Sequence, residues 1–345
     1  MSQITTKEIA SIAGVSVGTV DRVIHNRGQV ADKTRKKIQE IIDKNGYQPN
    51  LIARNLVQKK KLKIVTILPT YQAGGYWSKV WQGIHRAENE LRGQSLSLEP
   101  IFYDIKKPES LLKSISKIRL DEPIGLILSP SSKYVCLKII NYLKTSCEKF
   151  KYIFVDTNYV DLQPLAFFGQ DASKSGALCG KLMSLSGCSN KQFNLYIQND
   201  DVVIQKTIQD RIEGLLEYIK NNKILCNPYK MTTKQIYSEL NSGTVNLKNI
   251  LFIPHSRANK VIEELNLNQL SKLNLIIGYD ITNDNEYLLR SDKIDILINQ
   301  NPELQGYLAV QTIYKNHFFN YAIEPNNYFP IEIVTKENID FIQKF

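Results

Sequence analysis

The amino-acid sequence predicts an α/β protein with two parts, an N-terminal three-helix helix-turn-helix headpiece and a larger domain of two parallel-sheet lobes. Three observations predict this architecture. Short amphipathic segments with helix-capping residues occupy the first 45 residues, and the excess positive charge is concentrated there. Strand-like and helical segments alternate from residue 63 onward. A chain of 345 residues is long enough for about two or three domains.

The first two helices are predicted from their ends and their apolar positions. Thr5 and Glu8 have the spacing of a capping box, in which side chains bind the free amides of a first helical turn. Gly14 favours a tight turn, and Ser16 is suited to begin the second helix. The apolar stripe of the first helix and its complement on the second are Ile9, Ala10, Ala13, Val15, Val20 and Val23.

Two helices this short cannot bury a core alone, so a third is needed. Residues 34–45 provide it, because Ile38, Ile41 and Ile42 recur at helical spacing while the basic residues before them face solvent. A three-helix unit with a small-residue turn before its second helix is a helix-turn-helix. In this motif the second helix enters the major groove of DNA.

The charge distribution supports DNA binding independently. Residues 1–63 hold 13 Lys and Arg against 5 Asp and Glu, so they carry +8 of the net charge of +10. Such asymmetry suits phosphate binding, because each neutralised phosphate releases condensed counterions. A solvated basic arm is the alternative on charge alone, and the helix pattern favours the DNA-binding interpretation.

From residue 63 the pattern changes to apolar β-rich runs separated by helices, which is typical of parallel sheets covered on both faces. Strands are predicted at residues 64–69, 98–103, 125–129, 152–156, 193–197, 250–254 and 275–280. Helices are predicted at residues 77–91, 109–118, 135–148, 173–184, 208–220 and 259–265. This number of units indicates two lobes. We assign them approximately to residues 63–160 with 296–322 and residues 161–295 with 323–345.

A linker separates the two parts. Residues 46–50, Gly-Tyr-Gln-Pro-Asn, stop the third helix, and residues 51–57 form at most a helix too short to be stable alone in water. We therefore divide the chain into a headpiece of residues 1–48, a hinge of residues 49–62 that orders on contact, and a larger domain of residues 63–345.

Several classes of protein are disfavoured by the composition. The sequence has no apolar run of transmembrane length, and its first residues do not read as a secretory signal. Its five cysteines form no Cys-x-x-Cys pair, so we expect buried thiols in a reducing, cytoplasmic compartment and no membrane partner. Without nucleophile-elbow, phosphate-loop or zinc-protease motifs, and with four histidines, we expect no enzyme, no metal and no cofactor.

A series of motifs runs through the headpiece and the hinge. They are Ile12-Ala13-Gly14-Val15-Ser16, Thr19-Val20, Arg22-Val23, Asn26, Thr34-Arg35, Gly46-Tyr47-Gln48-Pro49-Asn50, Ala53 and Leu56. They resemble the DNA-binding headpiece of the lactose/galactose repressor family. The alternating pattern after residue 63 resembles that family's effector domain, which is similar to periplasmic sugar-binding proteins. The resemblance implies a periplasmic-binding-protein-like fold and a homodimer that binds a pseudo-palindromic operator in double-stranded DNA. It also implies a small-molecule effector, a sugar or sugar derivative.

The resemblance also implies roles for individual residues in DNA binding. At the exposed start of the recognition helix, Arg22 suits a guanine and Val17 a thymine methyl group. In the hinge, Leu56 is expected to wedge between base pairs in the minor groove, and packing on the neighbouring lobe is the alternative. The full expected set is Thr5, Ser16, Val17, Gly18, Thr19, Asp21, Arg22, His25, Asn26, Asn50, Ala53 and Leu56.

Effector-binding residues are expected where strand ends face the cleft between the lobes. Asp, Arg and Gln suit vicinal hydroxyl groups, because their planar forks hold two at once. Individually, a strand-end Asp often caps the next helix, and a helical Arg is often a solvated charge. The expected residues are Asp156, Arg211, His255, Asp280 and Gln300, with Trp77 as a stacking candidate and Tyr71 and Asp171 at the cleft edge.

The leading interpretation is a dimeric, ligand-responsive repressor of genes for carbohydrate utilisation. In it, the effector shifts the equilibrium between two lobe arrangements and thereby changes hinge order and operator affinity. Two alternatives remain: a solute-binding protein of a transport system, which would need export, and a regulator controlled by a protein co-regulator.

Overall fold

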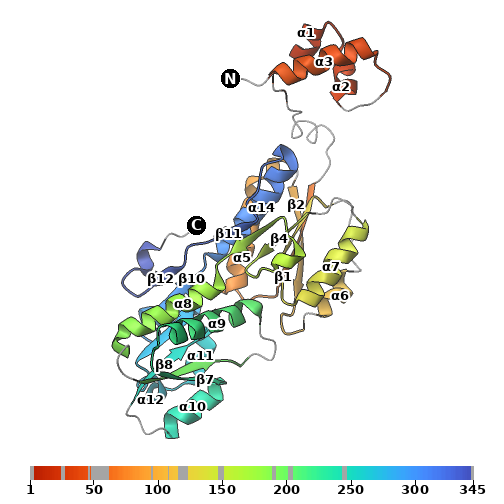
Figure 1. Ribbon diagram of the computed structural model, residues 1–345. Coiled ribbons are helices and arrows are strands. Elements are labelled where there is room, and N and C mark those ends of the chain that lie inside the picture. The colour runs from red at the N-terminus through yellow and green to blue at the C-terminus, as the bar shows by residue number, and fades with distance from the viewer. Residues whose placement is uncertain are drawn as a thin grey trace. The chain divides into compact units, whose positions relative to one another are not determined.

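The computed structural model describes residues 4–24, 28–45, 47, 62–94, 96–107, 109–115, 123–146, 151–188, 192–200, 205–242 and 247–342. The chain divides into two compact units, Met1–Lys60 and Lys61–Phe345 (Figure 1). No helix in the described ranges combines the length and the apolar character needed to cross a membrane.

The described part of the first unit consists of α1 (Thr6–Ala13), α2 (Val17–Ile24) and α3 (Asp32–Asn45). The predicted capping box begins α1: the Glu8 carboxylate accepts from the Thr5 N–H at 2.7 Å, and Thr5 Oγ1 accepts from the Glu8 N–H at 3.3 Å. Gly14 ends the helix in the left-handed conformation, with φ 72°. Both predicted ends of α1 are confirmed.

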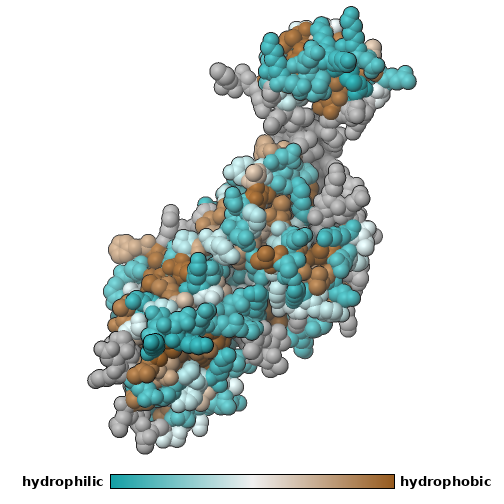
Figure 2. All heavy atoms as spheres, viewed as in Figure 1, coloured by the Kyte–Doolittle hydropathy of each residue, from teal (hydrophilic) through white to brown (hydrophobic). Residues whose placement is uncertain are grey.

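A small apolar core joins these three helices. Its buried members are Ile9, Ala10, Ala13, Val20, Val23 and Ile38, so the predicted stripes on α1 and α2 face each other, with Val15 only partly buried at the edge. Lys37 on α3 donates through Nζ to the Ala13 carbonyl at 2.9 Å and thereby satisfies an orphan carbonyl at the end of α1. Hydrophilic residues cover most of the visible surface of these helices (Figure 2).

The first lobe of the second unit is built on a parallel sheet in the order β11-β5-β4-β3-β1-β2. Its strands are β1 (Leu62–Pro69), β2 (Leu96–Tyr103), β3 (Gly125–Leu128), β4 (Tyr152–Val155), β5 (Ala166–Gly169) and β11 (Asn326–Tyr328). Helices α6 (Ser110–Ile115) and α7 (Lys133–Ser146) pack on one face, and α5 (Tyr76–Glu90) and α14 (Pro302–Phe319) pack on the other.

The second lobe has a sheet in the order β12-β10-β9-β8-β6-β7, parallel except for β12. Its strands are β6 (Phe193–Gln198), β7 (Cys226–Met231), β8 (Lys248–Phe252), β9 (Leu275–Tyr279), β10 (Ile296–Asn299) and β12 (Glu332–Val334). Its helices are α8 (Ala172–Met183), α9 (Lys206–Asn221), α10 (Thr233–Ser242), α11 (Ala258–Glu264), α12 (Leu267–Leu270) and α13 (Asn283–Arg290).

Apolar residues on both faces of the central strands explain why this sheet is buried on both sides. Along β8, Ile250 and Phe252 pack under α8 and α9, whereas Leu251 packs under α10, α11 and α13 on the opposite face. Successive side chains point to opposite faces of a strand, so a continuous apolar run supplies both cores.

The expected lobe boundaries were wrong at three places where the chain crosses between lobes. β5 belongs to the first sheet, so the first crossing follows residue 169 and not residue 160. β10 pairs with β9 in the second sheet, and β11 pairs with β5 in the first. Each of these strands has only three or four residues, and its own sequence does not specify its partner.

Candidate functional site

Helix α2 presents an exposed face that carries the expected base-reading side chains. Val20 and Val23 are buried in the headpiece core, and this orientation leaves Gly18, Asp21 and Arg22 exposed. Val17, at the first position of α2, is 44% exposed although it is apolar. An exposed apolar side chain is suited to contact a thymine methyl group, and an exposed Arg is suited to contact a guanine edge.

Two further residues of the expected set shape the start of α2. Ser16 Oγ accepts from the Thr19 N–H at 3.2 Å, so Ser16 caps the helix as its position predicts. The two hydroxyl groups of Ser16 and Thr19 lie 2.9 Å apart and are hydrogen-bonded to each other. Thr5 is exposed at the start of α1. The other expected DNA-binding residues lie outside the described residues and stay predictions: His25, Asn26, Asn50, Ala53 and Leu56.

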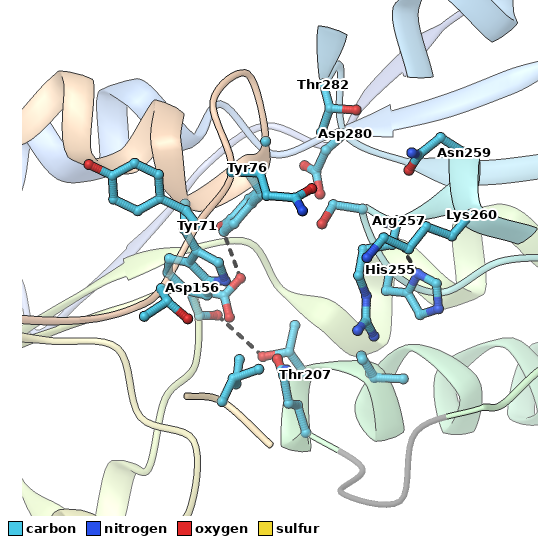
Figure 3. A pocket seen from close by; sticks show the side chains of 18 of the residues that line it. Tyr71, Tyr76, Asp156, Thr207, His255, Arg257, Asn259, Lys260, Asp280 and Thr282 are labelled. Atoms are coloured by element: carbon cyan, nitrogen blue, oxygen red, sulfur yellow. Dashed lines mark hydrogen bonds between the residues drawn. The ribbon is translucent and has the colours of Figure 1, made fainter. Parts of the chain in front are cut away.

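A cavity of about 400 Å³ lies between the two lobes of the second unit (Figure 3). The first lobe contributes residues that follow β1, β2 and β4, and the second contributes residues from α9 and from the segments after β8, β9 and β10. Carboxyl ends of parallel strands therefore meet at the cavity. Seven of the eight residues expected from the sequence line it: Tyr71, Trp77, Asp156, Arg211, His255, Asp280 and Gln300.

The eighth residue, Asp171, which was expected at the cleft edge, is not among the residues that line this cavity. Its side chain caps α8, where Oδ1 accepts from the Lys174 N–H at 2.9 Å. The Lys174 ammonium lies 3.8 Å from the other carboxylate oxygen. The ordinary structural role of a strand-end Asp, capping the next helix, holds for this residue.

Asp156 is buried in the cavity wall directly after β4. Its Oδ1 accepts from the Tyr76 hydroxyl at 2.9 Å, and its Oδ2 accepts from the Thr157 hydroxyl at 3.0 Å. Burial raises the pKa of Asp156, while the positive charge of Arg211 and the two hydrogen bonds act in the opposite direction. The carboxyl group is therefore held in place and keeps lone pairs that a ligand hydroxyl can use.

Asp280 occupies the equivalent place after β9. Gln300 Nε2 donates to both of its carboxyl oxygens, at 3.0 and 2.9 Å, and the Gln300 carbonyl in turn accepts from Gln305 Nε2 at 2.9 Å. Burial raises the pKa of Asp280 to about 7, against the lowering effect of Arg211. This carboxyl group therefore changes charge near neutral pH.

Arg211 projects from α9 and is 3% exposed. Its Nη1 donates to the Pro254 carbonyl at 2.8 Å, and its guanidinium carbon lies 3.9 Å from the centre of the Tyr279 ring. These contacts are possible because α8 and α9 pack closely: a Cβ on Gly176 would come within 1.9 Å of the Arg211 carbonyl oxygen. Stacking and a single backbone hydrogen bond thus fix the guanidinium plane.

His255 lines the cavity, but both of its ring nitrogens have partners within the protein. Nδ1 accepts from the Arg257 N–H at 3.2 Å, which assigns the hydrogen to Nε2. Nε2 therefore donates to Gln198 Oε1 at 2.6 Å. His255 consequently shapes the wall, and its ring nitrogens are already occupied by protein partners.

Sequence reasoning missed Tyr76 and Thr207, which both line the cavity (Figure 3). The Thr207 hydroxyl lies 2.7 Å from the hydroxyl of Thr157 and thereby connects the two lobes. A signal was present for each: Tyr76 precedes Trp77 at the start of a helix, and Thr207 stands one helical turn before Arg211.

The two lobes also meet beside the cavity at Gly74 and Asn283. The Gly74 carbonyl, in the segment between β1 and α5, accepts from the Asn283 N–H at the start of α13 at 3.2 Å. Gly74 has φ 77°, which favours glycine. Together with the Thr157–Thr207 contact, this hydrogen bond holds the lobes against each other in this structure.

The fold and the cavity define a two-lobed ligand-binding domain that follows a helix-turn-helix unit in the same chain. Residues 5–50 match the model of bacterial regulatory proteins of the lacI family, and residues 64–316 match that of a periplasmic binding protein domain. The chain thus carries a DNA-binding domain of the lacI family of bacterial regulatory proteins, followed by a larger domain that belongs to the periplasmic binding protein domain family.

Curated relatives match over part of the length. Catabolite control protein A of Streptococcus mutans is 41% identical over 81 residues, which are 24% of this chain and 24% of that protein. The HTH-type transcriptional regulator DegA of Bacillus subtilis is 31% identical over 117 residues, 34% of each chain. The matched part thus spans about a quarter to a third of the length of these relatives.

Solved structures resemble the chain over more of its length. A putative LacI transcriptional regulator from Bacteroides fragilis has a TM-score of 0.73 at 24% identity and covers 82% of this chain and 100% of its own. A solute-binding protein of an ABC transporter from Burkholderia graminis was solved in complex with D-arabinose. It has a TM-score of 0.68 at 15% identity, and the match covers 82% of this chain and 99% of that protein. At these identities the similarity shows the fold.

Proposed function

We propose that the protein is a ligand-responsive, sequence-specific DNA-binding transcription regulator. The observation that carries the proposal is the exposure of Val17 and Arg22 on α2, in a headpiece that matches the lacI family. A homodimer would place two such helices on the half-sites of a pseudo-palindromic operator.

The proposed effector is a sugar or sugar derivative bound between the lobes, and the proposed role is repression of genes for carbohydrate utilisation. Buried carboxyl, amide and guanidinium groups that converge on one cavity support this ligand class, because such groups bind vicinal hydroxyls in pairs. An effector that prefers one lobe arrangement would change operator affinity by a coupling of about 1–3 kcal/mol.

The DNA-binding proposal is tested by selecting duplexes from a random pool and measuring their affinity by fluorescence anisotropy against competitor DNA at moderate salt. We expect a recurrent pseudo-palindrome. Arg22→Ala should lose about 1–3 kcal/mol at one base position. The matched control is Lys33→Ala, which removes an exposed cation from α3. A protein that prefers no duplex over competitor, with or without sugars, contradicts the proposal.

Both alternatives remain distinguishable from this function. The first alternative, a solute-binding protein, is compatible with the fold of the second unit, which solved sugar-binding proteins share. It does not explain why the chain also carries a helix-turn-helix. Thermal-shift screening of the full chain against mono- and disaccharides, uronic acids and sugar phosphates separates the remaining cases. A specific shift supports a small-molecule effector, and no shift with any member of the panel favours a protein co-regulator.

A further inference from the structure

The guanidinium of Arg211 is the buried group in the cavity whose hydrogen-bonding capacity is least used. Nη1 donates to the Pro254 carbonyl, whereas Nε and Nη2 are buried and have no hydrogen-bond partner among the described residues. Nε and Nη2 lie on one edge of the planar group, so their N–H bonds form a fork. Because Arg211 lines the cavity, a bound ligand can fill this fork.

The charge of Arg211 also lacks a directly bonded anion. The two buried carboxyl groups of the cavity are bonded to other side chains: Asp156 accepts from Tyr76 and Thr157, and Asp280 accepts from Gln300. Burial raises the pKa of both carboxyl groups, against the lowering effect of the Arg211 charge. A buried cation is stabilised best by a hydrogen-bonded anion.

We infer that the effector is a sugar acid whose carboxylate binds the Nε–Nη2 fork of Arg211 while its hydroxyl groups bind the carboxyl side chains of the cavity. This inference rests on the proposed function of the cavity and specifies its ligand class. The two oxygens of a carboxylate match the two N–H bonds of the fork, and their charge pairs with the guanidinium. A neutral diol also fills the fork but gives the guanidinium no directly hydrogen-bonded anion.

A sugar acid fits this cavity better than a sugar phosphate. Arg211 is the fully buried cation among the lining residues that the structure describes, so the interior offers one positive charge for one carboxylate. The remaining cations of the lining, Lys106, Arg257 and Lys260, are half-buried or exposed. The exposed carboxylates Asp104 and Asp284 lie in the same lining, and a phosphate of higher charge would have to compete with them.

The experiment compares matched pairs of acid and neutral sugar by isothermal titration of the full chain. The probes are D-glucuronate against D-glucose, D-galacturonate against D-galactose, and D-gluconate against D-glucitol. We expect at least one acid to bind about ten-fold or more tightly than its neutral partner, since charge-assisted bidentate hydrogen bonds exceed neutral ones. Equal or tighter binding of the neutral partners, or binding of none of the acids, overturns the inference.

Variants then assign the preference to Arg211. Arg211→Gln should remove the preference for the acid, whereas Lys220→Gln, which removes an exposed cation of the same helix outside the cavity lining, should retain it. Arg211→Lys keeps the charge without the fork, so it should keep only part of the preference. Retention of the full preference by folded Arg211→Gln overturns the inference. Should that variant fail to fold, wild type is compared with Arg211→Lys instead. Retention of the full preference for the acid by Arg211→Lys then overturns the inference.

The outcome is separable from that of the proposed function. Operator selection and anisotropy report DNA binding without any sugar, so a regulator with a neutral effector would bind DNA and favour neutral sugars in titration. That result overturns the sugar-acid inference and leaves the regulator intact.

Discussion

Asp156 and Asp280 occupy corresponding places in the two lobes of the protein. Each directly follows a buried strand, β4 or β9, in the left-handed conformation, with φ 68° and 65°. Each donates its backbone N–H to the neighbouring strand, Asp156 to the Phe168 carbonyl at 3.0 Å and Asp280 to the Ile298 carbonyl at 2.9 Å. Left-handed backbone is tolerated by Asp and aims both carboxyl groups at the shared cavity.

This relationship couples the two carboxyl groups electrostatically. The negative charge of Asp156 raises the pKa of Asp280, and the positive charge of Arg211 lowers the pKa of both. Like charges from separate lobes oppose each other when the lobes close, and the guanidinium between them offsets part of that repulsion. A ligand that adds hydrogen bonds to these groups therefore favours the closed arrangement.

We predict that Asp280 makes stability depend on pH. Its pKa rises to about 7 in the folded protein from an ordinary value of 3.8, so its contribution is fully present below pH 3.8 and is lost as pH rises towards 7. Asp280→Asn should flatten this dependence by about 1 kcal/mol per pH unit within that window. Urea unfolding at pH 5 and 7 measures the change in the free energy of unfolding between the two pH values, with exposed Asp284→Asn as control. An unchanged slope in Asp280→Asn would contradict the burial effect.

We predict that Gly74→Ala weakens effector binding. A Cβ at Gly74 would lie 2.5 Å from the side-chain amide nitrogen of Asn283, and φ 77° is unfavourable for alanine. The hydrogen bond between the lobes should be lost, and the effector dissociation constant should rise by about three- to ten-fold because the closed state is less populated. Titration measures it. Gly93→Ala, where a Cβ meets no atom within 4 Å, is the control and should bind normally.

We predict that Thr5→Ala destabilises the headpiece. The variant removes one half of the capping box at α1 and leaves the Glu8 N–H without its acceptor. The loss should be about 1 kcal/mol in the free energy of unfolding of this unit. Amide hydrogen exchange of α1 in the full chain measures it, with exposed Lys7→Ala as control. Equal protection in both variants would show that the cap contributes nothing.

We predict that Leu56→Ala weakens operator binding and leaves effector affinity unchanged. In the proposed mechanism Leu56 wedges between base pairs of the operator, and its loss should reduce affinity by about 10- to 100-fold. Anisotropy with the selected operator measures it, and Val57→Ala is the neighbouring control. Unchanged operator affinity in Leu56→Ala would remove the hinge-wedge model.

Part of the cavity could be predicted from the sequence because its residues follow apolar strands. Asp156, Asp280 and Gln300 come directly after such runs, and the carboxyl ends of parallel strands meet at one edge. Asp171 was expected at the cleft edge, and in the structure its side chain caps α8. The local sequence allows an Asp at the end of a strand either to face the cavity or to cap the next helix, and only the packed structure selects between these two positions.

Helix α14 shows a second kind of limit. It is an 18-residue helix that the sequence did not predict. Its buried positions recur at three- and four-residue intervals, but they include Gln305 and Gly306, whereas the apolar Leu304 and Leu308 are only partly buried. It packs on α5 and on the sheet of the first lobe. A helix whose buried and partly buried positions both mix polar and apolar residues gives no clear amphipathic signal.

The sequence by itself determined the headpiece, because its capping box, glycine turn and apolar stripes act between residues a few positions apart. It also determined the alternation of strands and helices that places polar groups at strand ends. The tertiary structure alone decided which lobe receives β5, β10 and β11, that Tyr76 and Thr207 join the cavity, and that both ring nitrogens of His255 are occupied. These outcomes depend on contacts between residues far apart in the chain, whose energies no local pattern contains.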